Sequence, residues 1–409
     1  MSKLAILTQY YPPETGAPQN RLHSLSKNMI ACGYDVTVFT SMPNYPNMEV
    51  AEGYKKKWQS SEVIDEVKVY RSWLFVSKNT SIVFRLINYF SFCATSFFRM
   101  LVRMKRSEVI ICESPPLFLG ITAVLISRIK RTPLVFNVSD LWPKSAEELG
   151  LIKNKSIIRI TTLLEEWIYK KSSAICGQTK GIVGDIQSRF PQKPIYWFPN
   201  GVDSELIERD FSLIPSLRKG YRINDQTLVI GYAGIIGHAQ GLEIIISAAK
   251  TLVNQDLLFL LAGSGPMLSS LQEMVKAEGL QNIMFIGSFP KEKMLEVIAT
   301  FDLAFVPLKK SKLFLGAIPS KIFENLALKK PLLLGVDGEA KALFIDQGKA
   351  GLFYEPENST ELTKAIEKFI SDKSLRYELG ENGRKFVIEN FNRKHIAESF
   401  AEFLKNLKK

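Results

Sequence analysis

Short apolar segments alternate with longer helix-like segments along most of the chain, and this alternation limits the fold more than any other feature. In the first half, the expected strands are Leu4–Leu7, Val36–Thr40, Val109–Cys112, Leu134–Phe136, Ala174–Cys176 and Tyr196–Phe198. In the second half, they are Val229–Tyr232, Leu258–Leu261, Met284–Ile286, Leu303–Val306, Leu332–Leu334 and Leu352–Tyr354. Such alternation is typical of parallel sheets with helices on both faces. The sequence therefore predicts an α/β protein with two doubly wound domains that face each other.

A turn-rich stretch near the middle, Pro199–Asp203, marks the expected boundary between the two domains. The chain has 409 residues, which suits two or three domains of ordinary size. We expect an N-terminal domain at residues 1–203, a C-terminal domain at 204–385 and a final helical segment at 386–409. Residues 42–60 interrupt the alternation as a long loop, and such loops are usually functional or mobile.

Net charge, cysteine spacing and the absence of metal-binding motifs limit the classes of function that fit the chain. The formal net charge is +12, which favours polyanionic partners such as nucleic acid, phosphorylated ligands or an anionic membrane face. The four cysteines include no C-x-x-C pair, and neither H-E-x-x-H nor D-x-D occurs. We therefore expect no disulfide framework and no metal site. The first apolar run ends at Leu7 and is too short for a secretory signal, so we expect a protein of the reducing cytosol.

The segment 81–104 is unusually apolar but contains three arginines. Its longest uncharged stretch, 86–98, has 13 residues, whereas a spanning helix needs about 20. We therefore expect a helix that lies in the membrane interface, with its aromatic side chains in lipid and cations beside them. The cations expected to contact the membrane are Arg99, Arg103, Lys105 and Arg106. The alternative is a core helix whose arginines extend to solvent.

Two loops of the first domain carry candidate binding residues. The loop 9–18, with Glu14 and Gly16, follows the first strand and begins a helix that is expected to run to about residue 32. Such a strand–loop–helix unit can bind an anion or a sugar, although an ordinary structural loop remains an alternative. The loop 137–143 follows another strand, and here Asp140 could orient a hydroxyl or accept its proton. Trp142 offers a flat face for a sugar; the alternative is a capping aspartate on a buried aromatic turn.

Two glycine-rich loops follow strands of the second domain. Residues 231–243 contain four glycines, and these would let the backbone approach a diphosphate closely. The alternative is a tight turn that packs the strand on the next helix, which we expect to begin near Gly241, with Glu243 in its first turn. The candidate ligand-binding residues of this loop are Gly234, Gly237 and Gln240. Gly263 and Gly265 form a turn at the same sheet edge, and either ligand contact or a purely lining role fits them.

The segment 316–327 carries the most specific pattern. Pro319 suits the first turn of a helix, because its missing N–H costs nothing there. Ser320 and Lys321 would then offer backbone N–H groups and an ammonium to a diphosphate. Glu324 lies one turn further and can bind a ribose diol. The alternative is a surface helix with an ordinary Lys–Glu pair.

In their order and spacing, these segments resemble glycosyltransferase family 4, the retaining enzymes of the GT-B fold, over essentially the whole chain. Asn200–Asp203 resembles the family's N-G-V-D boundary, and Gly263–Pro266 resembles its G-x-G-P turn. Pro331–Leu333 is similar to the strand that follows the glutamate helix, and Phe285–Pro290, with Phe289, is similar to the stretch beside the nucleotide base. The resemblance implies a GT-B fold of two Rossmann-like domains across a crevice, with segment 386–409 crossing back to the first domain.

Departures from the family pattern are informative. The family usually carries Glu-x7-Glu ending at the position of Glu324, but the first position is Gly316 here. The usual Arg and Lys that hold the donor phosphates would fall within 236–240, and neither is present, so Lys321 must carry more of that role. The motifs D-L-W-P-x-S, A-Q-G-L-E and P-S-K-x-x-E resemble a bacterial surface-polysaccharide subgroup that includes N-acetyl-L-fucosamine transferases.

The resemblance implies retaining, metal-independent transfer of a sugar such as L-FucNAc from a UDP-linked donor. The acceptor would be a polyprenyl-diphosphate-linked glycan of O-antigen, capsule or exopolysaccharide synthesis, at the cytoplasmic face of the membrane, with no nucleic-acid partner. The implied catalytic residues are Asp140, Lys321 and Glu324. The implied donor-binding residues are Gly16, Gly234, Gly237, Gln240, Gly263, Gly265, Phe289, Pro319, Ser320, Lys321 and Glu324. The implied acceptor-binding residues are Glu14, Asp140 and Trp142.

Three other interpretations remain. A nonhydrolysing nucleotide-sugar 2-epimerase shares the architecture but would form the epimer without an acceptor. A non-enzymatic polyanion-binding protein would account for the net charge, although the basic residues are spread along the chain and no nucleic-acid motif occurs. A glycosyltransferase fold that has lost catalysis would account for the missing glutamate at Gly316. The sequence leaves the oligomeric state open.

Overall fold

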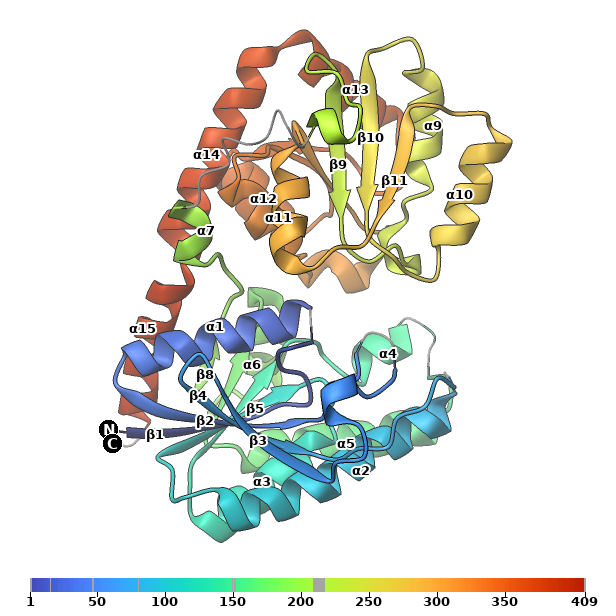
Figure 1. Cartoon of the computed structure of the whole chain (residues 1–409). Coiled ribbons are helices and arrows are strands. Elements are labelled where there is room, and N and C mark those ends of the chain that lie inside the picture. The colour runs from blue at the N-terminus through green and yellow to red at the C-terminus, as the bar shows by residue number, and fades with distance from the viewer. Residues whose placement is uncertain are drawn as a thin grey trace. The chain divides into compact units, whose positions relative to one another are not determined.

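The structure is a computed structural model that describes residues 2–14, 16–45, 48–79, 81–148, 150, 152–208 and 218–407. The chain divides into two compact units (Figure 1). The N-terminal unit comprises Met1–Asn200 together with Arg393–Lys409, and the C-terminal unit comprises Gly201–Asn392. The boundaries expected from the sequence, 203/204 and 385/386, lie near these two junctions.

The N-terminal unit is built on a sheet that has eight strands within the described residues, in the order β3-β4-β2-β1-β5-β6-β7-β8. The strands are β1 (Ser2–Leu7), β2 (Tyr34–Ser41), β3 (Gln59–Ile64), β4 (Val67–Ser72), β5 (Val109–Ser114), β6 (Leu134–Val138), β7 (Ala174–Gly177) and β8 (Ile195–Trp197). All pairs are parallel except β3 with β4. The central strands β5 and β6 are buried along their whole length, as expected where helices cover both faces.

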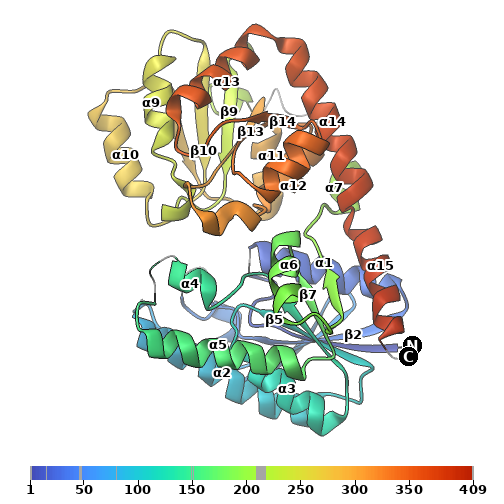
Figure 2. The same cartoon turned by 180° about the vertical axis from the view of Figure 1, so that it is seen from behind.

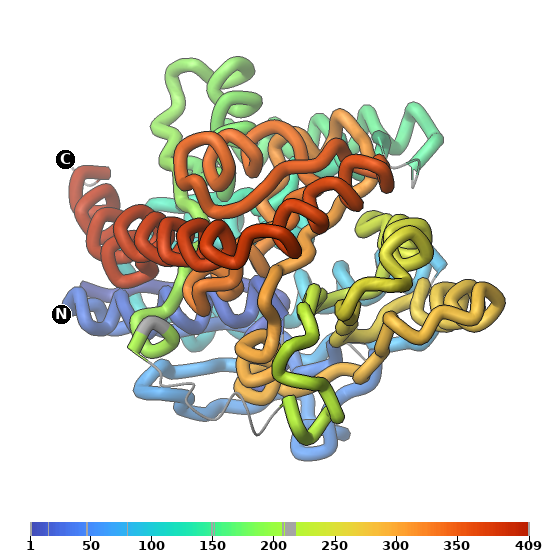
Figure 3. The backbone as a smooth tube through the Cα atoms, turned by 90° about the horizontal axis from the view of Figure 1, so that it is seen from above, coloured from blue at the N-terminus to red at the C-terminus, as the bar shows by residue number. Residues whose placement is uncertain are grey.

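Helices cover both faces of this sheet (Figures 1 and 2). One face packs against α2 (Ile82–Arg103), α3 (Leu119–Lys130), α5 (Lys155–Lys171) and α6 (Lys180–Arg189). The other packs against α1 (Ala17–Ala31) and the C-terminal helix α15 (Arg393–Asn406). Figure 3 shows α1 and α15 side by side. Rings of Phe400 and Phe403 stack on Phe198 and Tyr196. The end of the described chain is thus part of the first unit's core.

The hairpin β3–β4 is absent from the sequence-based expectation, which placed a loop over residues 42–60 and no strand after it. Its turn is formed by Asp65 and Glu66, both with positive φ (44° and 66°). Alternate residues of β3 are exposed, so the strand lacks the continuous apolar run that marked the others. Arg71 of β4 is fully buried, and its guanidinium donates to Glu62 and to the carbonyls of Ser41 and Pro12. The hairpin is therefore tied to the loop that follows β1.

The C-terminal unit contains, in the described part of the chain, a six-stranded parallel sheet in the order β11-β10-β9-β12-β13-β14. The strands are β9 (Leu228–Ala233), β10 (Leu257–Ala262), β11 (Ile283–Gly287), β12 (Leu303–Pro307), β13 (Leu332–Gly335) and β14 (Gly351–Phe353). The helical segments are α7 (Ser204–Glu208), η2 (His238–Gln240), α9 (Ile244–Thr251), α10 (Leu268–Ala277), α11 (Lys291–Ala299), η3 (Lys312–Gly316), α12 (Lys321–Ala327), a π-helix at Lys341–Gln347, α13 (Ser359–Ser371) and α14 (Lys373–Phe391). The remaining short elements, η1 (Glu52–Tyr54) and α4 (Lys144–Glu148), belong to the N-terminal unit. Parallel order places every loop that follows a strand at one edge of this sheet.

The end of the chain differs from expectation in one respect. The sequence predicted one final helical segment at 386–409, whereas the structure has parts of two helices there, α14 and α15, separated by Asn392. Val202 pairs with Asn392, and the Val202 N–H donates to the Phe391 carbonyl at 2.9 Å. Arg393 donates to the Asn200 side chain at 2.9 Å. The N-G-V-D segment thus meets the interruption between the two helices.

Candidate active site

In the C-terminal unit, the loops that follow β9 and β10 are held together by backbone hydrogen bonds. The Gly234 N–H donates to the Ala262 carbonyl at 2.9 Å, and the Ile236 N–H donates to the Ser264 carbonyl at 2.9 Å. The Met267 N–H donates back to Ile236 at 3.0 Å. The two glycine-rich loops expected to bind the donor therefore form one layer at the carboxyl edge of the sheet.

Packing alone accounts for two of the predicted donor-binding glycines. Gly263 has φ +153°, and a Cβ there would lie 1.8 Å from the Gly234 carbonyl oxygen. Gly265 has φ +155°, and a Cβ would lie 2.4 Å from the Ile236 oxygen. At Gly231, a Cβ would strike the ring of Phe301. These three glycines are needed for close packing whether or not a ligand touches them, which favours the structural alternative for them.

Lys321 reaches this layer from the start of α12. Its Nζ lies 3.6 Å from the centre of the Tyr232 ring, and a Cβ on Gly234 would lie 3.0 Å from Nζ. The surrounding protein removes water from the ammonium and lowers the pKa of Lys321 from 10.5 to about 7. Among the described residues, no carboxylate forms an ion pair with it, so the structure does not support the alternative of an ordinary Lys–Glu surface pair. The site therefore holds a cation that lacks a counter-ion.

The residues around Lys321 are placed slightly differently from expectation. Helix α12 begins at Lys321, with Ser320 as its N-cap and no side-chain capping bond. Pro319 lies before the helix, so the expectation that it occupies the first turn is wrong. Its carbonyl instead accepts from the Ile322 N–H at 3.1 Å. Glu324 lies in the first turn and is partly buried, as expected for a residue one turn from Lys321.

Three further predicted positions border the same sheet edge. Gly237 is the N-cap of η2, and a Cβ there would lie 2.8 Å from the Gln240 side-chain oxygen. The sequence predicted Glu243 in the first turn of the helix. The structure instead has it as the N-cap residue of α9. Phe289 is partly buried and directly precedes Pro290, the N-cap of α11. These residues lie in loops that follow β9 and β11.

In the N-terminal unit, the predicted acceptor residues are anchored to different segments. Glu14 is buried, and one carboxylate oxygen accepts from the N–H groups of Asn44 and Tyr45 at 2.7 and 2.8 Å. Burial raises the pKa of Glu14, and these bonds oppose the rise. Gly16 is the N-cap of α1, where a Cβ would lie 2.4 Å from the Gln19 side-chain oxygen. Glu14 therefore organises the loop 42–45, a role that the sequence did not suggest.

Asp140 and Trp142 follow β6. Asp140 is an exposed residue whose carboxylate accepts from the Ser145 hydroxyl at 2.8 Å. Desolvation of the carboxyl group raises the pKa of Asp140, opposed by the bonds from Ser145 and from the Leu141 N–H. Trp142 is partly buried and packs edge-on against Phe118, with ring centres 5.4 Å apart, at the border of the apolar core. For Trp142, the buried aromatic turn that the sequence left as an alternative is therefore part of its role.

Sequence reasoning missed a buried polar network beside these residues. Arg21 of α1 donates to Glu113, the penultimate residue of β5, and both side chains are almost fully buried. Ser139 and Asn137 also donate to Glu113, at 2.6 Å each. The only sign of this network in the sequence was Glu113, a carboxylate at the end of an otherwise apolar strand. Its partners are distant in sequence, so their meeting depends on the fold.

The expectation that Arg99 faces a membrane is wrong. Arg99 is 5% exposed, and its guanidinium donates to Gln59, the Ser60 carbonyl and the Ser61 hydroxyl. It therefore fastens α2 to β3. The other three predicted cations, Arg103, Lys105 and Arg106, are exposed.

The outer face of α2 is apolar. Val83, Ile87, Phe90, Phe98 and Val102 are exposed at helical spacing, Phe98 by 63% and Val102 by 77%. Further exposed apolar side chains lie on the neighbouring helices: Leu125, Ile129, Ile157, Ile160 and Leu163. No helix in the described ranges is long and apolar enough to cross a membrane. We call the exposed apolar residues of α2, α3 and α5 the three-helix face.

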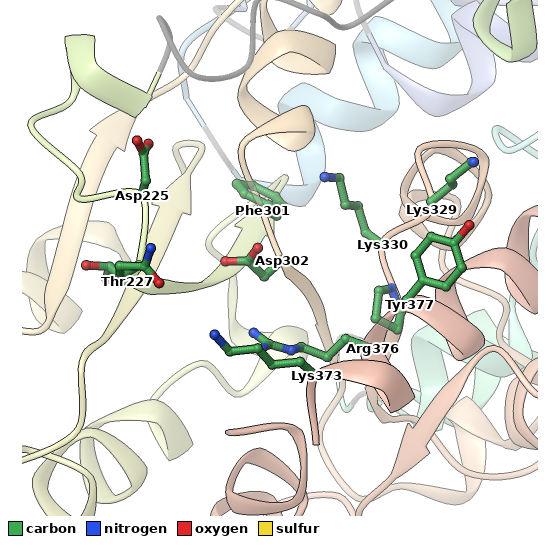
Figure 4. Close-up of a pocket in the computed structure, with 11 residues that line it drawn as sticks. Asp225, Thr227, Phe301, Asp302, Lys329, Lys330, Lys373, Arg376 and Tyr377 are labelled. Atoms are coloured by element: carbon green, nitrogen blue, oxygen red, sulfur yellow. The ribbon is translucent and has the colours of Figure 1, made fainter. Parts of the chain in front are cut away.

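A pocket of about 350 Å³ lies at the opposite, amino edge of the C-terminal sheet (Figure 4). It is lined by residues that precede β9, β12 and β13 and by the first turns of α14, among them Asp302, Lys330 and Arg376. Lys330 donates to the Ala299 carbonyl at 2.7 Å, and Asp302 is paired with Arg218. The pocket contains none of the donor-binding residues predicted from the sequence. Within the described chain, no cluster of three or more His, Cys, Asp or Glu side chains could hold a metal ion.

Two family descriptions match the chain in succession. Residues 16–201 match the family described as Glycosyl transferase 4-like domain. Residues 214–386 match the family described as Glycosyl transferases group 1. The matches fall on the N-terminal and the C-terminal unit respectively.

Relatives and solved structures agree with these matches. The chain is 24% identical over 332 residues to WcaI of Escherichia coli (strain K12), named as a colanic acid biosynthesis glycosyl transferase, over 80% of this chain and 81% of WcaI. Sucrose-phosphate synthase from Thermosynechococcus elongatus has a TM-score of 0.75 at 15% identity, over 100% of this chain and 99% of that one. Anabaena HepE in complex with UDP-glucose has a TM-score of 0.73 at 17% identity, over 99% and 100%. With its two parallel-sheet α/β units, the chain therefore belongs to the family 4-like glycosyltransferases of the GT-B fold.

Proposed function

We propose that the chain is a retaining transferase that uses a UDP-linked sugar and a polyprenyl-diphosphate-linked glycan acceptor. The observation that carries the donor class is Lys321, a desolvated ammonium beside the backbone of Gly234 that has no carboxylate partner among the residues the structure describes. A diphosphate supplies the negative charge that this ammonium lacks. HepE, which has the same fold, is described in complex with UDP-glucose, and this supports UDP as the nucleotide.

The sugar and the pathway are proposed from motif resemblance and from the name of one relative. The motifs around Asp140, Gln240 and Lys321 resemble enzymes that transfer N-acetylated deoxysugars such as L-FucNAc. The name of WcaI associates that protein with colanic acid biosynthesis. We therefore place this chain in the synthesis of O-antigen, capsule or exopolysaccharide.

In the proposed reaction, the bond between the sugar C1 and the β-phosphate oxygen breaks as an acceptor hydroxyl oxygen bonds to C1. The acceptor attacks the face from which UDP leaves, and its proton passes to the departing phosphate, so no enzyme nucleophile is needed. Lys321 stabilises the charge that develops on the diphosphate. Glu324 binds the ribose diol, and Asp140 orients the acceptor hydroxyl. We propose that a metal ion is not required, so EDTA should leave the rate unchanged.

We further propose that the three-helix face lies against the cytoplasmic membrane surface, where a polyprenyl-linked acceptor resides. Three adjacent helices expose apolar side chains on the same side of the N-terminal sheet. The exposed cations of these helices and of the segments that follow them include Arg103, Lys105, Arg106, Arg128, Lys155 and Arg159. Apolar area flanked by cations fits an anionic lipid surface.

The test of the donor site is thermal unfolding with UDP, GDP, TDP and CMP. A ligand at 100 times its Kd should stabilise the protein by about 2.7 kcal/mol. We expect a clear shift with UDP that is lost in Lys321→Met and in Glu324→Ala. Lys276→Met, which removes an exposed lysine of α10, is the matched control and should keep the shift. A full UDP shift in Lys321→Met would contradict the assignment.

Turnover is then measured as UDP release from UDP-N-acetyl-L-fucosamine and, separately, from UDP-glucose, with polyprenyl-diphosphate-linked N-acetylglucosamine as the acceptor probe. Transfer of either sugar with retained anomeric configuration supports the proposal. Epimer formation without acceptor, or UDP binding without any transfer, would overturn it.

A further inference from the structure

The pair formed by Arg21 and Glu113 is the most deeply buried ion pair that the described residues contain, with side chains 4% and 2% exposed. Arg21 Nη2 lies 2.5 Å from one carboxylate oxygen of Glu113, Oε1. The same oxygen accepts from the Ser139 hydroxyl at 2.6 Å, and Oε2 accepts from the Asn137 amide at 2.6 Å. Arg21 also donates to the Ser139 oxygen at 2.8 Å. Three side chains, from α1, β6 and the loop after β6, thus share the carboxylate that β5 supplies.

Stability alone does not explain this network. Desolvating two charges costs about as much as their attraction returns, and apolar replacements of buried pairs are often as stable. The network also leaves Arg21 Nη1 and Asn137 Oδ1 buried without a hydrogen-bond partner in the described part of the chain. Such an arrangement fixes geometry at the expense of stability.

The network fixes the relative positions of two segments proposed to serve the reaction, the start of α1 and the loop after β6. Arg21 lies in the second turn of α1, the helix that begins at Gly16. Ser139 directly precedes Asp140, and its backbone N–H donates to the Ser114 carbonyl at 2.9 Å. The ion pair therefore ties the start of α1 to the segment that bears Asp140.

We propose that Arg21 and Glu113 are positioning residues that act through Ser139 to hold Asp140 in place for the acceptor hydroxyl. This inference rests on the proposed function, because it assigns a purpose to Asp140. Neither residue touches the reacting atoms. Loss of the pair should lower kcat, with little change in donor binding.

The test compares Glu113→Gln with a rescue variant. In Glu113→Gln, the side chain keeps one acceptor oxygen where the carboxylate offers two, so Arg21, Ser139 and Asn137 can no longer all donate to it. Adding Asn137→Asp restores an acceptor and keeps the total charge. We expect kcat to fall at least tenfold in Glu113→Gln and to recover to within about threefold in the double variant, while the UDP-induced shift in Tm is unchanged in both.

A second buried pair in the same unit provides the matched control. Glu165 is 4% exposed and accepts two hydrogen bonds from Arg189, at 2.7 and 2.9 Å, between α5 and α6. Glu165→Gln should lower Tm and leave kcat unchanged. Ser139→Ala removes only the link toward Asp140 and keeps the ion pair, so it should lower kcat with little change in Tm, even where Glu113→Gln fails to fold.

The outcomes separate the two claims. If the wild type binds UDP but transfers no sugar, the proposed function fails, and this inference fails with it. If the wild type is active and Ser139→Ala and Glu113→Gln keep its kcat, only the inference is overturned. A fall in kcat that the added Asn137→Asp substitution reverses supports it.

Discussion

At the residue scale, Lys321 is the clearest case of function opposing stability. Its pKa is lowered to about 7 because water is removed from the ammonium and no carboxylate takes the place of water. The contact with the Tyr232 ring offsets only part of that loss. A cation held in this way is ready to gain from an anionic ligand. The residue is therefore better explained by binding than by folding.

The affinity for UDP should depend on this titration. A bound diphosphate stabilises the ammonium and raises the pKa of Lys321, so binding takes up a proton when the free side chain is neutral. Affinity should therefore be highest near pH 7 and fall above it, by up to about tenfold per pH unit. Isothermal titration calorimetry between pH 7 and 9 measures this slope, and buffers of different ionisation enthalpy measure the proton uptake.

Variants at the same position provide the control for this prediction. In Lys321→Arg, the new side chain stays charged between pH 7 and 9. Titration at this position should therefore no longer change the UDP affinity of the variant with pH. Free Lys321 has a folded-state pKa below the unfolded value of 10.5. The unfolded chain therefore binds more protons between about pH 7 and 10.5, and Lys321 makes stability rise with pH over that window. Lys321→Met should remove this slope and raise the Tm at pH 6; a lower Tm would contradict the assignment.

At the element scale, the proposed donor site depends on two loops that approach each other more closely than side chains permit. The Gly263 position faces the Gly234 carbonyl, and the Gly265 position faces the Ile236 carbonyl. Rigid backbone contacts of this kind hold the Gly234 loop where Lys321 can reach it. Under the proposed function, loop packing and donor binding are therefore coupled in this unit.

Gly263→Ala should separate steric clash from backbone strain. The new methyl group would lie 1.8 Å from a carbonyl oxygen, so the loops must separate. Gly279→Ala is the matched control, because Gly279 has φ +63° and open space around its Cβ position. The control should lose about 1 kcal/mol in urea unfolding, and Gly263→Ala at least about 2 kcal/mol more. Equal losses would show that the loops do not constrain this position.

The elements that sequence reasoning could identify are those with one dominant signal. Strands of the two parallel sheets were predictable because strands covered on both faces are continuously apolar. The hairpin β3–β4 was not, since half of the side chains of β3 are exposed and the Asp65–Glu66 turn lacks glycine. Lys321 and Glu324 could be identified because they are close in sequence. The pair of Arg21 and Glu113 could not, because 91 residues lie between them and only the sheet order brings them together.

At the scale of the whole molecule, the structure shows where part of the excess positive charge lies. The net charge is +12, and the basic residues are spread along the sequence. The fold places several exposed cations around the three-helix face, whereas Arg99 is buried and bonded to β3. Helical periodicity could suggest an amphipathic helix. It could not show which arginine of that helix would be buried. The surface charge and the exposed apolar area together give the membrane proposal a testable form.

Flotation with lipid vesicles tests that surface. Replacing Arg103, Lys105 and Arg106 by Gln should weaken binding to phosphatidylglycerol-containing vesicles at least tenfold, since each interfacial cation contributes about 1 kcal/mol. Phosphatidylcholine vesicles should bind the wild type and this variant equally. Phe98→Glu should weaken binding to both vesicle types, because it places a charge on the apolar stripe.

Two controls make the result specific to this surface. Replacing Lys276, Lys364 and Lys385 of the C-terminal unit by Gln removes the same net charge from exposed positions and should leave vesicle binding nearly unchanged. Arg99→Gln should lower Tm through loss of its bonds to β3, while the folded protein still binds vesicles. If the C-terminal variant loses as much binding as the Arg103, Lys105 and Arg106 variant, attraction depends on net charge alone and the three-helix face has no special role. Loss of binding only in variants of that face would instead place the N-terminal unit, proposed to bind the acceptor, at the lipid surface.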